Sequence, residues 1–384
     1  MSLTHPRLPK IRAAFSGHSI AARLDATDGR PSGFDYIRVV LALCVIFWHS
    51  QLTAYGGSDR GTWQTILSPF AFLIVPMFFA LSGFLVAGSL ERSKTLITFL
   101  GLRVIRIMPA LSVEVLLSAL ILGPLLTSKP LGAYFSDPVF QSYFWNILGD
   151  IHYRLPGLFE SNPVPLVNGQ LWTVPYELIC YLMLTGLSVF GIFKRRRWLL
   201  LCLVALYVAE IANTAFRPNL DYKGPGGTTL LISFVAGLVI YRYRDMIAWS
   251  KSLFAIALVL SLILTNFPNG IRFVAIPAAY CVVYLGLLDP SKNKIILSGD
   301  YSYGLFLYGF PIQQAIMSIS PGLRQWYTNI LVSLPCAVFV AVCSWWLVEK
   351  PVLAHRSKLK QLEVWYLGWR PAVGRTLKSA DPTP

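Results

Sequence analysis

The sequence has few charged residues. They make up 13% of its 384 positions, whereas hydrophobic residues make up 55% and the mean hydropathy is +0.57. Soluble domains usually carry about 25% charged residues. The composition therefore excludes an ordinary soluble globular protein. It predicts an all-α, polytopic integral membrane protein.

Several catalytic signatures are absent as well. The sequence contains no G-x-S-x-G, no G-x-x-x-x-G-K-[ST], no H-E-x-x-H, and no histidine with an aspartate five residues later. Its six cysteines lie in apolar segments without C-x-x-C spacing, which is typical of small packing residues. These absences disfavour serine-triad, phosphate-loop and zinc mechanisms. We expect neither a bound metal nor a bound cofactor.

Acidic residues are also few, with 18 against 33 basic ones and a net charge of +15. About ten apolar spans suggest transmembrane helices: 34–55, 64–90, 107–126, 171–193, 197–212, 228–241, 252–266, 271–288, 301–320 and 328–349. If the N-terminus is cytoplasmic, 25 basic residues fall on the inner side and 7 on the outer side. This asymmetry follows the positive-inside rule and argues against a nucleic-acid partner. We predict that both termini are cytoplasmic.

The predicted organisation has three parts. Residues 1–33 form a basic cytoplasmic tail, 34–350 a transmembrane domain, and 351–384 a cytoplasmic tail that lies on the inner membrane surface. The first 33 residues are polar, unlike the short leader of a cleaved signal peptide. We expect the first helix to remain in the membrane.

The span 34–55 carries Arg38 and His49 within an apolar sequence. Eleven helical residues return to within about 20° of the starting face and rise about 16 Å. Both groups therefore share one face, three turns apart. An ionisable group inside a membrane helix costs at least about 2.5 kcal/mol unless it faces protein or water. The two residues line an interior site, or they extend to the two membrane interfaces.

Two further arginines, Arg103 and Arg106, lie on one helical face at the predicted cytoplasmic edge, just before Pro109. Arginine binds phosphate through paired, charge-assisted hydrogen bonds. The pair could equally anchor the helix at the membrane interface. The spacing alone does not separate phosphate binding from anchoring.

A carboxylate, Glu177, lies about two turns inside the fourth span. A buried carboxylate needs a partner, or it becomes neutral. Because the first span ends on the side where the fourth begins, we expect Glu177 and His49 at similar depth. The carboxylate would then orient the imidazole as a general base.

Taken in order, these segments resemble the acyltransferase-3 family of bacterial membrane O-acyltransferases, which modify O-antigens, exopolysaccharides and Nod factors. The resemblance covers about residues 34–351. It rests on Arg38 with His49, FFALSGFL, Arg103 and Arg106, LWTVPYEL, SYGLFLYGFP and the terminal VEKP. It implies ten transmembrane helices in the inner membrane, a cytoplasmic acyl-CoA donor such as acetyl-CoA, and a glycan or glycolipid acceptor on the far side. It also implies catalysis at His49, with the three arginines supporting donor binding.

The chain departs from the family pattern at Tyr308-Gly309-Phe310-Pro311, where many relatives read W-H-x-P, so no histidine function is expected there. The predicted reaction is transmembrane O-acyl transfer, with His49 as the general base or as a transient acyl carrier. The alternative is a secondary transporter whose intramembrane charges bind substrate. Such transporters often contain inverted repeats, and the two halves of this sequence show no convincing duplication.

Overall fold

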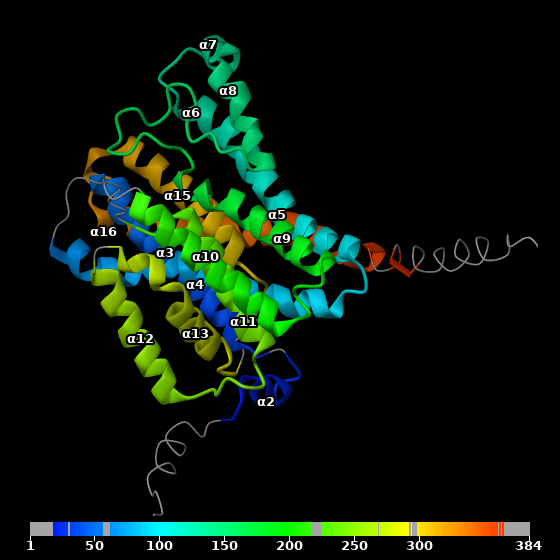
Figure 1. Cartoon of the computed structure of the whole chain (residues 1–384). Coiled ribbons are helices and arrows are strands. Elements are labelled where there is room, and N and C mark those ends of the chain that lie inside the picture. The colour runs from blue at the N-terminus through cyan, green and yellow to red at the C-terminus, as the bar shows by residue number, and fades with distance from the viewer. Residues whose placement is uncertain are drawn as a thin grey trace, which may run out of the picture.

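The computed structural model describes residues 18–29, 31–56, 62–216, 224–267, 269–291, 293, 298–359, 361 and 363–364. Among them, the backbone is helical apart from loops and one isolated bridge between Ser19 and Ala248, which confirms the all-α class (Figure 1). The outer parts of both predicted tails lie outside the described residues.

The elements, in which η denotes a 3-10 or π helix, are these in chain order: α2 (Ile20–Asp25), α3 (Gly33–Tyr55), α4 (Thr62–Arg92), α5 (Leu96–Leu117), η1 (Ser118–Leu122), α6 (Gly123–Leu126), α7 (Leu131–Ser136), α8 (Pro138–Ser142), η2 (Tyr143–Leu148), η3 (Gly169–Thr173), α9 (Val174–Val189), α10 (Arg196–Phe216), α11 (Gly227–Arg242), α12 (Lys251–Asn266), η4 (Gly270–Phe273), α13 (Ala275–Gly286), α15 (Ser302–Ile319), η5 (Pro321–Leu323), α16 (Trp326–Ser344), η6 (Trp345–Glu349) and α17 (Lys350–Ala354).

Helices occupy all ten predicted spans, but their lengths differ. Five segments are long and apolar enough to cross a membrane: Gly33–Tyr55, Ile66–Arg92, Leu96–Leu126, Arg196–Ala215 and Trp326–Leu359. The helices at the other spans, α9, α11, α12, α13 and α15, have 12 to 18 residues. A helix needs about 20 residues to cross a bilayer without help. The chain is thus a membrane protein, and the number of ten spans is not confirmed.

The segments predicted to share the side of the N-terminus do contact one another. The backbone of Ile20 bonds to that of Ile247, in the connection before α12. The backbone N–H of Ser32 donates to Asp289, which follows α13. Arg242 forms an ion pair with Glu91 at 2.5 Å. The connections 91–95, 241–250 and 287–291 therefore gather at one end of the bundle.

The opposite end collects the other connections. Tyr55, at the end of α3, donates a hydrogen bond to Gln325 before α16 at 2.7 Å. Asn162, from the connection before α9, donates to Gln314 near the end of α15. Beyond this end, α6, α7 and α8 continue the direction of α5 as an extension of the bundle (Figure 1).

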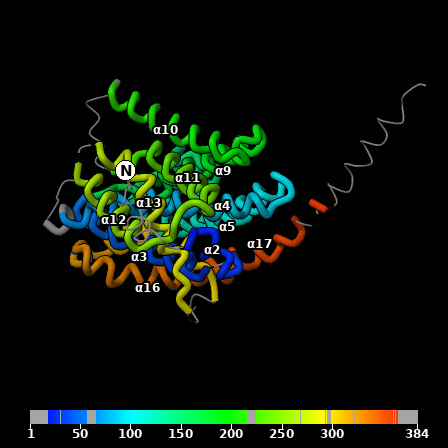
Figure 2. Tube along the Cα trace, turned by 60° about the horizontal axis from the view of Figure 1, so that its bottom comes forward, coloured from blue at the N-terminus to red at the C-terminus, as the bar shows by residue number. Residues whose placement is uncertain are grey.

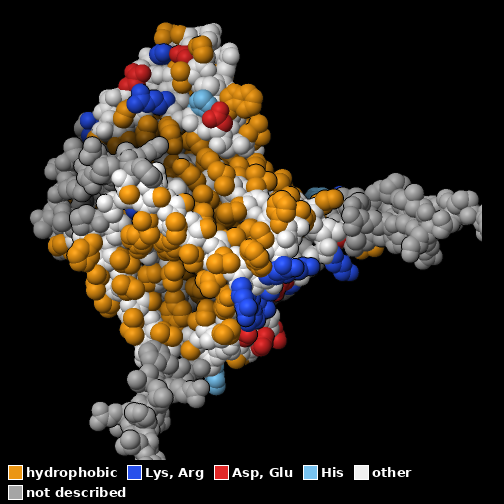
Figure 3. Space-filling model, viewed as in Figure 1, with side chains coloured by type: hydrophobic (Ala, Val, Ile, Leu, Met, Phe, Trp, Pro, Cys, Tyr) orange, Lys and Arg blue, Asp and Glu red, His pale blue; other side chains and the backbone are white. Residues whose placement is uncertain are grey.

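The centre of the bundle is the contact between α4 and α11, which lie between α10 at one edge and α16 at the other (Figure 2). Gly83 makes this contact close, because a Cβ at this position would overlap the backbone carbonyl of Phe234. Small residues allow membrane helices to approach in this way. At the edge, α10 exposes apolar side chains, and the visible face of the molecule is largely apolar, with charged groups near its ends (Figure 3).

Candidate active site

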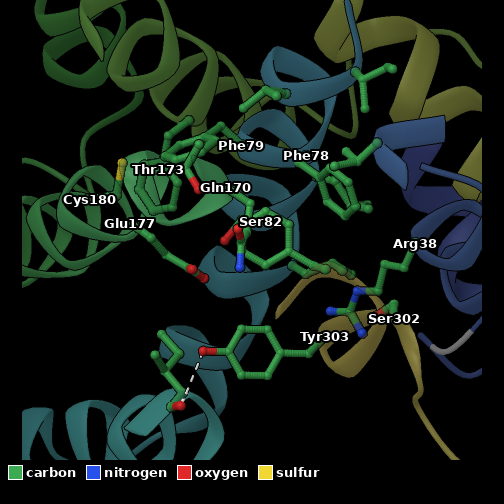
Figure 4. Close-up of a pocket in the computed structure, with 18 of the residues that line it drawn as sticks. Arg38, Phe78, Phe79, Ser82, Gln170, Thr173, Glu177, Cys180, Ser302 and Tyr303 are labelled. Atoms are coloured by element: carbon green, nitrogen blue, oxygen red, sulfur yellow. Dashed lines mark hydrogen bonds between the residues drawn. The ribbon is translucent and has the colours of Figure 1, made fainter. Parts of the chain in front are cut away.

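An interior cavity of about 200 Å³ lies between α3, α4, α5, α9 and α15. The five predicted site residues, although spread over 140 positions of the sequence, all line it: Arg38, His49, Arg103, Arg106 and Glu177. Arg38 and Glu177 are labelled in Figure 4. Most of the remaining wall is apolar and aromatic. A chamber of this kind, with a few convergent polar groups, is typical of a ligand site.

The histidine is held at the wall by an aromatic contact. The His49 ring meets the edge of Phe310 from α15, with ring centroids 5.1 Å apart and planes at 87°. Among the described residues, no side chain hydrogen-bonds to the imidazole. Arg38 lines the same cavity from the same helix, as the eleven-residue spacing predicts. The imidazole nitrogens are thus available to a substrate.

The predicted pairing of Glu177 with His49 is not found. Instead, the Glu177 carboxylate accepts a hydrogen bond from Tyr181, one turn later on α9, at 2.5 Å. Tyr181 lies 3.4 Å from the hydroxyl of Ser82 on α4. The electrostatic partners of Glu177 are the arginines, above all Arg103. The carboxylate therefore belongs to the arginine part of the cavity, and its catalytic role stays a prediction.

Two of the arginines are held by carboxylates that sequence reasoning missed. Arg106 pairs with Asp300 at 2.6 Å and with Glu349 at 3.0 Å, so both of its terminal nitrogens are engaged. Asp300 also pairs with Arg38 at 3.3 Å. The Tyr303 ring lies 5.7 Å from the Arg106 guanidinium and adds a cation–π contact. The network joins α3, α5, the start of α15 and the end of η6.

Asp300 lies just before α15, and its pKa falls from the usual 3.8 to about 2. Burial acts to raise this pKa, but the positive charges of Arg106 and then Arg38 outweigh it, with help from the Ser302 hydroxyl. Asp300 is thus a carboxylate at physiological pH. Its position directly before the span 301–320, on the side predicted for the arginines, is the sequence signal that could have identified it.

Glu349 is 2% exposed and ends the π-helical turn η6, whereas its neighbour Lys350 is exposed. Such π turns within helices often occur at functional sites. The residue belongs to the terminal VEKP segment. That segment contributes to the family resemblance, but no local sequence pattern pairs Glu349 with an arginine 243 positions away.

Arg103 differs from the other two arginines. Its terminal nitrogen donates to the Ser89 hydroxyl at 3.3 Å, and within the described part of the chain no carboxylate lies at ion-pair distance from it. Its Nε has no hydrogen-bond partner there either. Arg103 therefore retains the most capacity to bind an anion. No group of three potential metal ligands occurs among the described residues.

The match to known families settles the class of protein. Residues 32–349 match the sequence profile of the acyltransferase-3 family, described as an acyltransferase domain. This chain belongs to that family. The protein is therefore an acyltransferase, and the family resemblance that its motifs indicate is confirmed. The matched region contains all the cavity residues described above.

Two relatives are similar over nearly their full lengths. One is the "O-acetyl transferase" of Shigella phage Sf6, 26% identical over 350 residues, which covers 86% of this chain and 98% of the relative. The other is "Nodulation protein 10" of Rhizobium leguminosarum bv. viciae, 28% identical over 359 residues, which covers 87% and 96%. No solved structure matches this acyltransferase significantly.

Proposed function

We propose that this acyltransferase moves an acyl group, most simply acetyl, from cytoplasmic acyl-CoA to a hydroxyl of a glycan or glycolipid across the inner membrane. The observation that carries the proposal is one cavity that is lined both by His49, whose imidazole has no hydrogen-bond partner among the described residues, and by three arginines. The name of the phage relative, an O-acetyl transferase, supports acetyl as the group and oxygen as its acceptor. No feature of the described residues favours a transporter.

The orientation follows from charge. The end of the bundle that gathers the connections 91–95, 241–250 and 287–291 carries most of the described basic loop residues, which the positive-inside rule assigns to the cytoplasm. Both termini would then be cytoplasmic. Arg38 lies at the end of α3 nearest this side, and His49 lies three turns deeper. Donor and acceptor would therefore approach from opposite ends.

The cavity is too small for a whole acyl-CoA. Pockets that enclose drug-sized ligands have volumes of about 300–1,000 Å³, whereas this one has about 200 Å³. Only the acylated end of the donor would enter, while its phosphates stay near the arginines. Arg103, which lacks a carboxylate partner among the described residues, is the best placed phosphate ligand. Arg38 and Arg106 would add positive potential from positions fixed by Asp300.

His49 would carry the chemistry by one of two routes. In direct transfer, the acceptor hydroxyl attacks the thioester carbonyl and gives its proton to the imidazole. The new C–O bond forms, the C–S bond breaks, and the proton passes from His49 to the departing thiolate. In the second route, the imidazole first attacks the thioester, so that an N–C bond forms, the C–S bond breaks and CoA leaves as the thiolate. The acceptor hydroxyl then attacks the acyl-histidine, the N–C bond breaks, and the hydroxyl proton neutralises the CoA thiolate.

The test uses membranes that contain the full chain. Acetyl-CoA labelled in its acetyl group is supplied with surface polysaccharide from a strain that lacks the gene, and label is measured in the glycan. Transfer by the wild-type protein that disappears in His49→Ala supports the proposal. Consumption of acetyl-CoA without glycan labelling, or labelling that is independent of the protein, would contradict it. Mass spectrometry of glycans from the gene-deletion strain should show a missing acetyl increment.

A further inference from the structure

Gln170, on η3, lines the cavity together with Thr173 and is only 1% exposed (Figure 4). Its Nε2 donates to the backbone carbonyl of Leu307 at 2.6 Å. In a regular helix that carbonyl would accept from the N–H of residue 311, but residue 311 is Pro311, which has no N–H. Gln170 thus supplies the hydrogen bond that α15 cannot make, and the orientation of its amide is fixed.

The other atom of this amide is left without a partner. Within the described part of the chain, Gln170 Oε1 is buried and accepts no hydrogen bond. Turning the amide over would place this oxygen against the Leu307 carbonyl, oxygen to oxygen, and would lose the existing bond. A buried carbonyl without a donor is unfavourable. Gln170 is therefore a cavity-lining residue with a fixed amide and an unsatisfied acceptor atom, and a molecule bound against this part of the wall could satisfy that atom.

The position of Gln170 is next to the histidine side of the cavity. Its neighbour Gly169 packs against Phe310, since a Cβ at Gly169 would come within 2.6 Å of the Phe310 ring. The same ring contacts His49. The turn η3, Phe310 and His49 thus form one continuous layer. Gln170 is fixed to the wall that holds the proposed base.

The start of η3 is itself anchored in a buried polar cluster. Asn168 donates to the Glu114 carboxylate at 3.1 Å and contacts the hydroxyl of Tyr143. Glu114 also accepts from Ser118 at 2.7 Å, at the beginning of the π turn η1. Asn168, Glu114 and Ser118 are all nearly inaccessible to solvent. The turn that carries Gln170 is therefore held before any substrate arrives, as preorganised binding requires.

We infer that Gln170 is a specificity-determining residue for the acceptor, in that its Oε1 accepts a hydrogen bond from a hydroxyl other than the one that reacts. This contact holds the reacting hydroxyl toward His49. An uncharged amide oxygen suits a neutral donor, so the substrate class is a polyol with a second hydroxyl near the acylated position. The inference rests on the proposed function. The other group that could donate a hydrogen bond to Gln170 Oε1 is an amide N–H in the pantetheine arm of acyl-CoA.

The experiment uses purified full-length protein, acetyl-CoA, p-nitrophenyl glycosides of glucose, galactose, rhamnose and N-acetylglucosamine, and monodeoxy counterparts of the best acceptor. We expect the wild type to lose about 10- to 100-fold in kcat/KM for one deoxy acceptor, because Gln170 Oε1 is then left unpaired. Gln170→Met has a similar length but no amide. It should raise the acceptor KM, no longer distinguish that deoxy acceptor, and keep the KM for acetyl-CoA within twofold.

Gln313→Met is the matched control. Gln313 is also fully buried, its Nε2 donates to the Ile46 carbonyl at 2.8 Å, and its Oε1 also lacks a partner among the described residues. It does not belong to the cavity wall. This variant should discriminate between deoxy acceptors as the wild type does, even if it is less stable.

Gln170→Met that retains wild-type discrimination overturns the inference. A raised KM for acetyl-CoA in place of the acceptor KM also overturns it, because this result would assign Gln170 to the pantetheine arm. If Gln170→Met does not fold, Gln170→Asn, which draws the amide back by one methylene, is judged by the same criteria. Wild-type protein that acetylates no hydroxyl acceptor overturns the proposed function as well. Transfer by the wild type without the Gln170 effect overturns this inference alone.

Discussion

Arg106 and Asp300 form an ion pair of 2.6 Å although 194 positions separate them in the sequence. The pair joins α5 to the start of α15. The same Asp300 oxygen also contacts Arg38, and the other side of the Arg106 guanidinium meets Glu349. One carboxylate thus sets the relative positions of two of the three arginines in the cavity.

Asp300→Asn should lower kcat/KM for acyl-CoA by about 10- to 100-fold, because Arg38 and Arg106 lose the charge that fixes them. Asp300→Glu should restore part of the loss. Asp245, whose pair with Arg196 is exposed, supplies the control variant Asp245→Asn, which should behave as the wild type. The measurement is steady-state kinetics with acyl-CoA as the varied substrate. Unchanged donor kinetics in Asp300→Asn would show that this carboxylate does not position the arginines.

The pKa of Asp300 also predicts how its contribution to stability depends on pH. Its folded-state value of about 2 lies below the ordinary 3.8 because of Arg106 and Arg38, although burial opposes this shift. The stabilisation is therefore complete above about pH 4 and is lost as the pH falls toward 2. Thermal unfolding of the wild type and Asp300→Asn should differ at pH 7 and converge between pH 4 and 2. A difference that grows with acidification would contradict the assignment.

Arg103→Ala and Arg106→Ala should fail in different ways. Loss of Arg103, which has no carboxylate partner among the described residues, should raise the KM for acyl-CoA and leave the unfolding temperature nearly unchanged. Loss of Arg106 should also destabilise the protein, by up to about 3–5 kcal/mol, since Asp300 and buried Glu349 lose their main partner. Lysine at either position should rescue incompletely, because one ammonium cannot reproduce the guanidinium fork. Identical stability of both alanine variants would argue against the network.

His49→Ala should leave a folded, membrane-inserted protein whose acyl transfer is reduced by about 10²- to 10⁴-fold, the usual effect of removing a general base. His49→Gln should do no better, because an amide cannot accept the proton. Transfer is measured with labelled acetyl-CoA, and folding by thermal unfolding in detergent. Near-normal transfer by well-folded His49→Ala protein would eliminate this residue as the catalytic group.

Reporter fusions test the orientation. A reporter within 194–197 should be cytoplasmic, and one within 127–170 should lie on the opposite side, because these connections carry opposite basic biases. The structure places them at different ends of the bundle. Alkaline phosphatase and green fluorescent protein fusions report the two sides. Both reporters on one side of the membrane would contradict the proposed direction of transfer.

The sequence by itself determined the features that depend on local regularity. Arg38 and His49 share one cavity wall because eleven residues complete nearly three turns of any α-helix, whatever surrounds it. Apolar composition likewise required a membrane protein, and the ordered motifs identified the family. The count of ten spans is not confirmed. Helices such as α9 and α13, with 16 and 12 residues, are shorter than the about 20 residues that a bilayer requires, and apolar composition alone does not determine where a helix begins and ends.

Only the tertiary structure decided which polar groups meet. Glu177 turns to Tyr181 and the arginines and not to His49, because the packing of α9 against its neighbours, and not depth alone, sets the direction of its side chain. Gln170 finds the Leu307 carbonyl 137 positions away, where Pro311 left it free. Hydrogen bonds and ion pairs reach only about 3 Å. A partner so distant in the sequence becomes a neighbour only once the helices have packed.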